Sequence, residues 1–374
     1  MKIVIAMDSF KGSLTAEEAC DIVAEAIRSA RPETQVIVRP MADGGEGTAA
    51  VLMTAAAGQW VQSRVMGPLP DMQVDAGFAW LPESRTAVVE MASASGLQLL
   101  RRDQRNPLKT TTYGTGQLIR AAIDYGARRV LLAVGGSATV DGGVGAAMAL
   151  GWKFLARDGS EIGCGGDQLL PISEIIPPPQ GMDIPVDVLC DVDSPLCGPH
   201  GAAVVFGPQK GATAESVRTL DSALAHLAAL VQQQLGQDIR NLPGGGAAGG
   251  LAAGAVAFMG ARLTSGIEAV MSQCGLAAAV ADADWVITGE GRFDHQSLRG
   301  KVVSGVTRVA RERGARIGVI AGQVRLPSEV FRMAGIEAAL GCMAETMELE
   351  HALAHCRTLL AGAAREFAQR HLAG

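Results

Sequence analysis

The sequence is poor in aromatic residues and in histidine. Phe, Trp and Tyr together make up 4% of the 374 residues, and only 6 histidines occur. Protein-binding surfaces are enriched in Tyr and Trp, so this scarcity argues against a chain whose main task is to bind other proteins. Glycine, by contrast, occurs 47 times, and alanine is also abundant. This length and composition indicate an α/β enzyme that is packed with small side chains.

Clusters of basic residues and long apolar runs are also absent from the sequence. The formal net charge is -6 at pH 7, and the lack of a Lys/Arg stripe argues against a nucleic acid or an anionic membrane as partner. No apolar run approaches the ~18 residues of a membrane span. The first apolar run ends at Asp8, too early for a signal peptide. We therefore expect a cytoplasmic protein with no nucleic-acid or membrane partner.

Paired cysteine motifs are missing as well. Seven cysteines are scattered at positions 20, 164, 190, 197, 274, 342 and 356. An odd number without a repeated CxxC spacing argues against both a disulfide framework and a structural zinc site. We expect reduced, mostly buried thiols.

Short strands alternate with helices at both ends of the sequence. The first strand, KIVIAM, is rich in β-branched residues, and a Thr15-x-x-Glu18 capping box opens the helix that follows it. The predicted strands lie within 2–7, 35–41, 283–291, 316–322 and 337–342, and the predicted helices within 15–31, 48–57, 300–314 and 347–372. Five strands that alternate with helices in this way predict a flavodoxin-like parallel sheet.

The middle of the chain has a different sequence pattern. It contains strand-like runs at 74–81, 86–92, 128–134, 185–192 and 201–207, separated by glycine-rich loops. We predict an α/β fold in which a flavodoxin-like parallel-sheet domain (1–64 plus 284–374) is split by a second, inserted α/β domain with glycine-rich loops (65–283).

Acidic, glycine-rich loops recur along the sequence, as MADGGEGT (41–48), GGSATVDGGVG (135–145) and TGEGRFD (288–294). Glycines let backbone N–H groups approach a phosphate closely, but the neighbouring carboxylates would repel it. In an open parallel sheet, ligands bind beyond the carboxyl ends of the strands, where the strand order reverses. We therefore expect the loops at 8–13 and 288–294 to face each other, with 43–46 alongside. The candidate residues for substrate or phosphate are Asp8, Ser9, Lys11, Ser13, Asp43, Gly44, Gly45, Glu46, Glu290, Arg292, Asp294 and Lys301.

Phosphoryl transfer would explain why carboxylates and glycines occur in the same loops. Mg²⁺ neutralises the developing charge, and a carboxylate orients the attacking hydroxyl. We predict that Lys11 and Arg292 bind the transferring group and that Asp43 or Asp294 orients the hydroxyl. The alternative for each acid is a helix N-cap or first-turn charge.

The inserted region offers three more glycine-rich or polar loops. They supply the predicted nucleotide-binding residues Gly135, Gly136, Ser137, Thr139, Asp141, Lys210, Gly244, Gly245 and Gly246. The alternative for Lys210 is a solvated loop lysine. Asp191 and Asp193 are candidate Mg²⁺ ligands; a turn, or the Asp-x-Asp signature of a phosphatase, is the alternative reading of that segment.

Seven segments together carry a resemblance that extends over essentially the whole chain. They are MDSFKGSLTAEEA (7–19), PMADGGEGT (40–48), GGSATVDGG (135–143), CDVDSPLCG (190–198), FGPQKGA (206–212), PGGGAAGGL (243–251) and TGEGRFDHQSLRGK (288–301). In this order they make the sequence similar to bacterial glycerate kinases of the first, non-MOFRL type.

The resemblance implies Mg²⁺- and ATP-dependent phosphorylation of D-glycerate to 2-phosphoglycerate, in glyoxylate, glucarate or galactarate breakdown. We expect the reaction to occur in a cleft between the two domains. The alternatives are a glycerate 3-kinase that forms 3-phosphoglycerate, a Mg²⁺-dependent phosphatase built on Asp191, and a sugar-acid-binding protein without activity. The oligomeric state stays open, a homodimer included.

Overall fold

The computed structural model describes residues 1–344 and 346–372, and its contacts divide the chain into two compact units. Unit 1 comprises Met1–Asp43 and Ile267–Gly374, and unit 2 comprises Gly44–Gly266. Both divisions lie earlier than the predicted ones at 64/65 and 283/284. The first division is earlier because helix α2 (Thr48–Ala55), which was predicted to cover the flavodoxin-like sheet, packs on strands β4 and β5 of unit 2. The second is earlier because helix α10 (Leu276–Val280) contacts helix α11 (Val302–Glu312) of unit 1.

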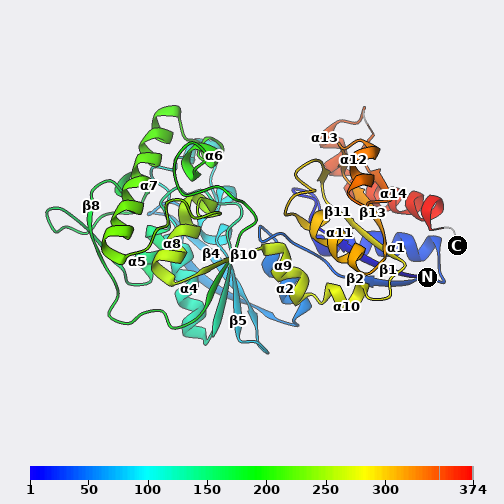
Figure 1. Cartoon of the computed structure of the whole chain (residues 1–374), viewed down its shortest axis with the longest axis horizontal. Coiled ribbons are helices and arrows are strands. Elements are labelled where there is room, and N and C mark those ends of the chain that lie inside the picture. The colour runs from blue at the N-terminus through cyan, green and yellow to red at the C-terminus, as the bar shows by residue number, and fades with distance from the viewer. Residues whose placement is uncertain (345, 373–374) are drawn as a thin grey trace. The chain divides into compact units, whose positions relative to one another are not determined.

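Unit 1 is built on a five-stranded parallel sheet with the strand order β15-β13-β11-β1-β2 (Figure 1). Numbered within the unit, this is the flavodoxin-like order 2-1-3-4-5, which confirms the predicted fold class. The strands are β1 (Lys2–Met7), β2 (Gln35–Val38), β11 (Trp285–Gly289), β13 (Arg316–Ala321) and β15 (Ala338–Gly341), and a small parallel pair is formed by β12 (Arg292–Phe293) and β14 (Gln323–Val324).

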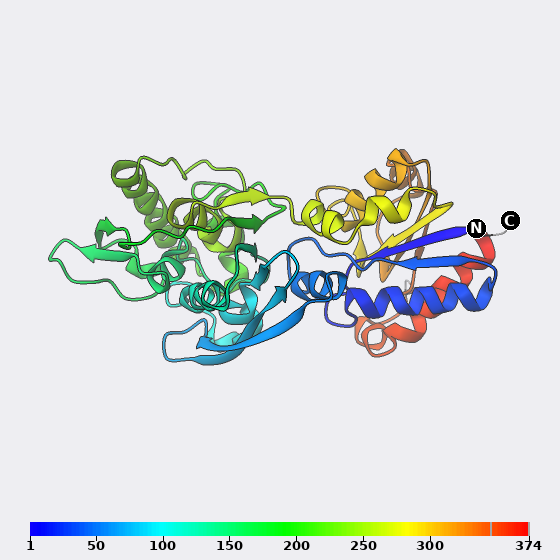
Figure 2. The ribbon, with the colours of Figure 1, turned by 90° about the horizontal axis from the view of Figure 1, so that it is seen from below.

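Helices cover both faces of this sheet. Helices α1 and α14 lie alongside each other and contact strands of one face, as Figure 2 shows for the blue and red helices, and α11 contacts β1, β11 and β13. The predicted capping box is present, since Thr15 accepts from the Glu18 N–H and Glu18 accepts from the Thr15 N–H. The helices are α1 (Ala16–Ala30), α9 (Gly266–Gln273), α10 (Leu276–Val280), α11 (Val302–Glu312), α12 (Ser328–Met333), α13 (Leu349–Ala354) and α14 (Cys356–His371).

The predicted closing helix at 347–372 is two helices. Helix α13 ends at Ala354 and α14 begins at Cys356, with His355 between them in a non-helical conformation (φ -113°, ψ 15°). The consequence is that α13 leaves the axis of α14. The core of the unit lies between the sheet and α1 and α14, and includes the buried side chains of Ile5, Trp285 and Phe367.

Unit 2 contains a six-stranded sheet with the order β10-β9-β6-β5-β4-β3. The first four of these strands run parallel, and β4 and β3 continue the sheet in antiparallel pairing. The strands are β3 (Gln59–Met66), β4 (Gln73–Leu81), β5 (Thr86–Glu90), β6 (Arg129–Ala133), β9 (Val186–Leu189) and β10 (Arg262–Thr264), and an antiparallel pair is formed by β7 (Lys153–Ala156) and β8 (Ile172–Ile176). The remaining helices are α3 (Ala92–Ser95), α4 (Tyr113–Tyr125), α5 (Val144–Ala149), α6 (Ala202–Phe206), α7 (Ala214–Leu235) and α8 (Leu251–Met259).

One strand-like run in unit 2 is helical. Residues 202–206 form α6, although the run contains two consecutive valines. The helix buries Ala202 and Ala203 against the cluster that includes α7, and it leaves Val204 and Val205 39% and 46% exposed. The prediction of a strand at 201–207 was wrong because tertiary packing of one face overrides the β-propensity of valine.

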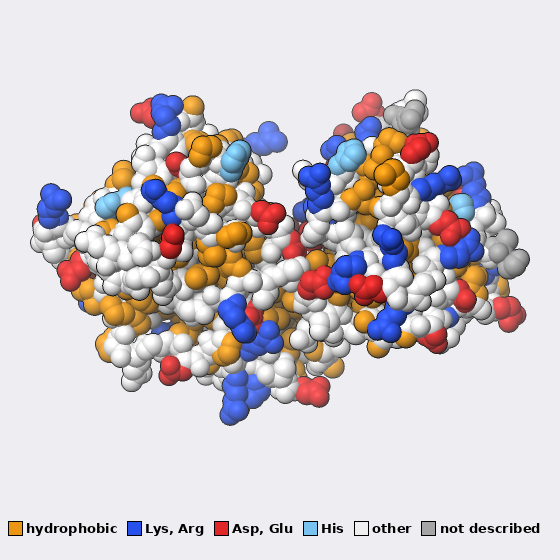
Figure 3. All heavy atoms as spheres, viewed as in Figure 1, with side chains coloured by type: hydrophobic (Ala, Val, Ile, Leu, Met, Phe, Trp, Pro, Cys, Tyr) orange, Lys and Arg blue, Asp and Glu red, His pale blue; other side chains and the backbone are white. Residues whose placement is uncertain are grey.

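The structure agrees with the absence of basic clusters and of long apolar runs from the sequence. Lys and Arg side chains are interspersed with Asp and Glu on the face drawn in Figure 3, rather than gathered into a field of one sign. Within residues 1–344 and 346–372, no helix combines the length and apolar character that a membrane crossing needs.

Candidate functional site

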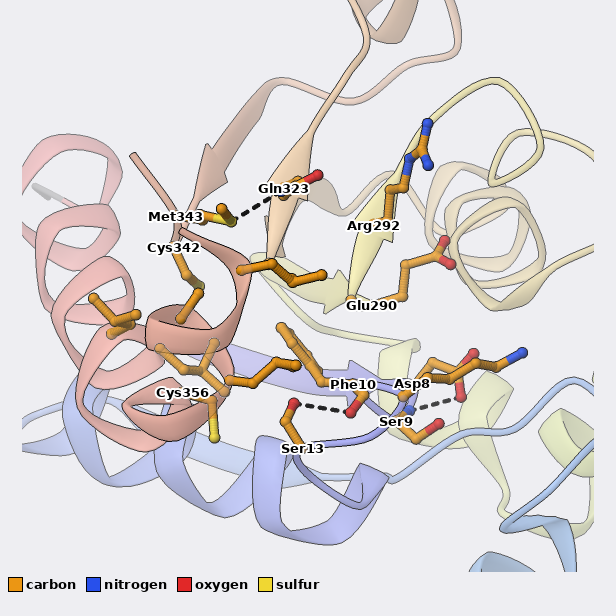
Figure 4. Close-up of a pocket in the computed structure, with 18 of the residues that line it drawn as sticks. Asp8, Ser9, Phe10, Ser13, Glu290, Arg292, Gln323, Cys342, Met343 and Cys356 are labelled. Carbon is orange, nitrogen blue, oxygen red and sulfur yellow. Dashed lines mark hydrogen bonds between the residues drawn. The ribbon is translucent and has the colours of Figure 1, made fainter. Parts of the chain in front are cut away.

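Unit 1 contains a cavity of about 470 Å³ at the carboxyl ends of its parallel strands (Figure 4). Asp8 follows β1, Glu290 follows β11, Gly322 follows β13, and Cys342 follows β15. Four neighbouring strands thus each deliver their next residue to the same space. Ligands of open α/β sheets bind at this edge, and the volume lies within the usual range of small-molecule sites.

The cavity brings together most of the residues that were predicted for substrate and phosphate. Those that line it are Asp8, Ser9, Lys11, Ser13, Asp43, Glu290, Arg292, Asp294 and Lys301. The predicted approach of the 8–13 and 288–294 loops is therefore found within unit 1. Gly44, Gly45 and Glu46 belong to unit 2 instead, so the 43–46 loop contributes only Asp43 to the lining of the cavity.

Three carboxylates create a strongly negative region inside the cavity. Asp8 is 8% exposed, and burial, followed by the charges of Asp43 and Glu290, raises its pKa to about 7, although the Ser9 N–H donates to it. Burial likewise raises the pKa of Glu290. The Oε1 atom of Glu290 is buried without a hydrogen-bond partner. Such an arrangement is costly unless a ligand supplies a proton or positive charge.

Cationic side chains stand beside these acids. Lys11 is exposed, Lys301 is half-buried, and the Arg292 side chain is 66% exposed. The Nε of Arg292 lies 3.2 Å from Oδ2 of Asp294, which orients the guanidinium. The other carboxylate oxygen, Oδ1, accepts from the Gln296 N–H at 2.9 Å. The site therefore presents mostly buried carboxylates and more exposed cations within one cavity.

The other end of the cavity is apolar, and sequence analysis did not identify it. Its wall consists of Phe10, Cys342, Met343, Leu349, Ala352, Leu353, Cys356, Leu359 and Leu360. In Figure 4, Glu290 and Arg292 point away from the end where Cys342, Met343 and Cys356 lie. Most of this wall comes from α13 and the start of α14. The available signal was the apolar spacing of the helix that follows the last strand, but this spacing does not distinguish a cavity wall from core packing.

Unit 2 holds a second polar cluster, around Lys210. The ammonium group of Lys210 donates to Ser137 Oγ at 2.6 Å and to the Thr139 carbonyl at 2.7 Å. Lys210 is 2% exposed, so its interpretation as a solvated loop lysine is wrong. Burial lowers its pKa to about 7, and the charge of Asp141 opposes this shift.

Asp141 is buried next to this lysine, at 1% exposure. It accepts from the backbone N–H and the hydroxyl of Thr112, at 2.7 and 2.9 Å, and from the Gly143 N–H at 3.2 Å. Burial raises its pKa, while these donors oppose the rise. The carboxylate thus holds its own loop in place.

The glycine-rich loops of unit 2 pack directly on one another. A Cβ atom on Gly135 would lie 2.6 Å from Cα of Gly45, and one on Gly249, whose φ is +67°, would lie 1.9 Å from the Thr139 carbonyl oxygen. The segments 44–46 and 135–136 therefore touch, as do the 135–145 and 243–250 loops. Glycine is required at these contacts because any side chain would separate the loops.

The proposed Mg²⁺ ligands of unit 2 are not arranged as a complete site. Asp191 accepts from the Gly266 N–H at 3.1 Å, and Asp193 is exposed. In the part of the chain that the structure describes, no three His, Cys, Asp or Glu side chains are grouped so that they could hold a metal ion by themselves. A metal site here would need ligands from the substrate or from water, as Mg²⁺ commonly has.

Comparisons with known proteins agree over nearly the full length. The model of the glycerate kinase family matches residues 3–372. The glycerate kinase of Halalkalibacterium halodurans is 43% identical over 369 residues, 98% of this chain and 97% of its own. The glycerate 2-kinase of Escherichia coli K12 is 41% identical over 355 residues, 94% of this chain and 93% of its own.

A solved structure shows the same fold. The crystal structure of a Salmonella typhimurium LT2 protein, described as a glycerate kinase 2, has a TM-score of 0.86 at 41% identity, and covers 99% of this chain and 97% of its own. The fold, the cavity at the sheet edge and the family match agree in their conclusion: this chain is a kinase of the glycerate kinase family.

Proposed function

We propose that this protein transfers the terminal phosphoryl group of ATP to D-glycerate and forms 2-phosphoglycerate. The observation that carries the proposal is the cavity in unit 1, where cations and carboxylates from consecutive strand ends line one space. The name of the Escherichia coli relative, glycerate 2-kinase, supports the 2-hydroxyl as acceptor. By resemblance we place the reaction in the cytoplasm, in glyoxylate, glucarate or galactarate breakdown.

Lys11, Arg292 and Lys301 are the residues that would bind the negative groups of the two substrates. All three line the cavity, and phosphoryl transfer depends mainly on the positioning of such groups and on electrostatic stabilisation of the transferred phosphoryl group. Asp294 is bonded to Arg292, so we propose that it sets the orientation of that guanidinium.

A carboxylate is also needed to accept the proton of the glycerate hydroxyl. Asp43 and Asp294 were the candidates from the sequence, and the burial of Asp8 supports a third. A general base must lie at the substrate and be able to take up a proton near the operating pH. Asp8 lines the cavity, and burial is the largest cause that raises its pKa to about 7, whereas the smaller contribution of Asp43 and Glu290 would fall once a cation binds them. We propose Asp8 as the base.

Mg²⁺ fits the same cavity. The orphaned Oε1 of Glu290 and the nearby charge of Asp43 provide oxygen donors of the type that Mg²⁺ prefers. When bound, the ion would neutralise phosphate charge. We propose Glu290 and Asp43 as its protein ligands, in preference to Asp191 and Asp193.

The function is tested by incubating the protein with D-glycerate and MgATP and following ADP release in a coupled assay. Phosphorus NMR of the product distinguishes 2-phosphoglycerate from 3-phosphoglycerate, and the latter would contradict the proposed acceptor hydroxyl. Phosphate release from phosphoesters without any nucleotide would indicate the phosphatase instead. Glycerate binding without ADP release would indicate a binding protein.

Two pairs of variants test the assignments. Lys11→Met is expected to lower kcat/KM about 100-fold, whereas Lys153→Met, whose side chain is 59% exposed in its pair with Glu161, should leave it unchanged. Glu290→Gln is expected to raise the Mg²⁺ concentration at half-maximal rate, and Asp191→Asn should not. The reverse result for the second pair would move the metal to unit 2.

A further inference from the structure

The cavity of unit 1 has two chemically different ends, and glycerate can use only one of them. Glycerate is a small acid whose hydroxyl and carboxylate groups suit the end with Asp8, Lys11 and Arg292. The opposite end is lined mainly by the apolar side chains of Phe10, Met343 and residues of α13 and α14, with Ser13 and Gln323 as the polar groups near it (Figure 4). A hydroxy acid would lose its hydration there and gain few hydrogen bonds.

The apolar wall is partly open to solvent. Leu349 and Leu353 on α13 are 60% and 40% exposed, while Phe10 and Leu360, at the back of the cavity, are 5% and 1% exposed. Exposed apolar side chains that continue into a cavity mark a ligand-binding surface. Helix α13 presents these two leucines from one side, since they are four residues apart.

Of the two substrates, only the nucleotide has a part that matches this wall. Its base is a planar aromatic ring that suits the apolar end of the cavity. Its phosphates are anions that suit the end with the cationic side chains. Thioether sulfur, as in Met343, contacts aromatic rings favourably. The cations Lys11, Arg292 and Lys301 line the same cavity, and Figure 4 shows Arg292 on the side away from Cys342 and Cys356, so they are available to the phosphates of a base bound at the apolar end.

We propose that the adenine base of ATP binds at the apolar end of this cavity, between α13 and the loops that follow β1 and β15. This assignment rests on the proposed use of ATP and deepens it, because it places the base in unit 1. The sequence analysis had placed the nucleotide at the 135–145 and 243–250 loops of unit 2.

The loops of unit 2 offer little free surface for a base. Ser137 is 8% exposed, Thr139 is fully buried, and the hydroxyl of Ser137 and the carbonyl of Thr139 are already bonded to Lys210. Gly244 and Gly246 are buried as well. These contacts hold two loops together, which is a structural task that needs no ligand.

Two cysteines distinguish the two possible nucleotide sites, the cavity of unit 1 and the glycine-rich loops of unit 2. Cys356 is half-buried and lines the apolar end. Cys190 is also half-buried, but its Sγ lies 3.6 Å from the Gly244 carbonyl oxygen, beside the glycine-rich loop of unit 2. Alkylation with N-ethylmaleimide, quantified for each cysteine by mass spectrometry, therefore measures which location a nucleotide covers.

The expected result is that ADP slows alkylation of Cys356 at least about fivefold and leaves Cys190 unchanged, whereas glycerate protects neither. Protection of Cys190 alone, or of neither cysteine, overturns the proposal. The footprint needs no turnover. A protein that fails to phosphorylate glycerate but shows the expected footprint would refute the proposed function and leave the base-binding site standing.

A kinetic test uses a surface leucine of the wall. Leu353→Ala is expected to raise the KM for ATP about fivefold to tenfold, from the apolar contact that is lost, with kcat and the KM for glycerate unchanged. Met333→Ala is the matched control, since Met333 lies on α12, is 86% exposed and does not line the cavity. A KM for ATP within twofold of wild type for Leu353→Ala would overturn the assignment.

Discussion

Replacing Lys210 with methionine removes a positive charge from the interior of unit 2 while it keeps most of the apolar stem. The lysine is 2% exposed and makes two hydrogen bonds, to Ser137 Oγ and to the Thr139 carbonyl. Methionine can fill a similar volume but donates to neither. The variant therefore separates the polar contribution of Lys210 from its packing.

The loss of stability in Lys210→Met can be estimated from the buried acceptors that lose their donor. A buried acceptor without its donor costs about 1–3 kcal/mol, and Lys210→Met leaves two such acceptors, Ser137 Oγ and the Thr139 carbonyl oxygen. Burial lowers the pKa of Lys210 to about 7, so at neutral pH the charge is only partly present. Removing the buried charge also removes the cost of burying it, so we expect Lys210→Met to lower the free energy of unfolding at pH 7 by about 2 kcal/mol, less than two full acceptor penalties.

Urea unfolding followed by tryptophan fluorescence measures this, because Trp60, Trp80 and Trp152 all lie in unit 2. The control is Lys109→Met. Lys109 pairs with Asp167 at 2.5 Å but its side chain is 59% exposed, and exposed pairs contribute at most about 1 kcal/mol. Equal, small effects of the two substitutions would refute the reasoning that the buried lysine holds the loop.

The pH dependence of the same variant has a definite sign. Lys210 has a pKa of about 7 in the folded protein against an ordinary lysine value of 10.5, so the unfolded chain binds more protons between these values. The free energy of unfolding then rises with pH, by at most ~1.4 kcal/mol per unit, from about pH 7 upward. The difference between wild type and Lys210→Met should therefore grow from pH 7 to pH 9, and a difference that shrinks would contradict the shift.

Two further predictions concern unit 1. Gly318→Ala should cost about 1–3 kcal/mol by overpacking, since its Cβ would lie 2.2 Å from Cζ of Phe367, whereas Gly362→Ala, in α14 with open space around it, should gain up to about 1 kcal/mol. Thermal unfolding midpoints should move in opposite directions, and shifts of one sign would count against the described packing. Thr15→Ala breaks the capping box with Glu18 and should cost about 1 kcal/mol in urea unfolding; an unchanged midpoint would show that the cap contributes nothing.

Most of unit 1 could be predicted because its elements carry local signals. The Thr15–Glu18 capping box and the β-branched first strand mark the positions of their elements, and the alternation of strands and helices predicts a parallel sheet. The flavodoxin-like order is one of the few that such an alternation allows. The break at His355 carries no such signal, since neither proline nor glycine stands there. Helix α2 was assigned to the flavodoxin-like unit but packs on the sheet of unit 2. Its sequence predicts a helix but does not indicate which sheet the helix covers.

The polar end of the cavity could be predicted for the same reason, since Asp8 and Glu290 follow their strands directly. The apolar end could not, because the leucines of α13 have the spacing of ordinary core residues. The burial of Lys210 depends on a loop 73 residues earlier in the chain. Such a contact is set by tertiary packing, and a lysine next to glycines has the local pattern of an exposed loop.

Unit 2 enters and leaves the chain at adjoining glycines. A Cβ atom on Gly44 would lie 3.1 Å from Cα of Gly266, so the first and last residues of this 44–266 segment touch. A segment whose ends meet can be cut out as one piece, and a very short linker would suffice to join Asp43 to Ile267. The chain is therefore interrupted at a single point of the flavodoxin-like unit, and everything between Asp43 and Ile267 belongs to the inserted one.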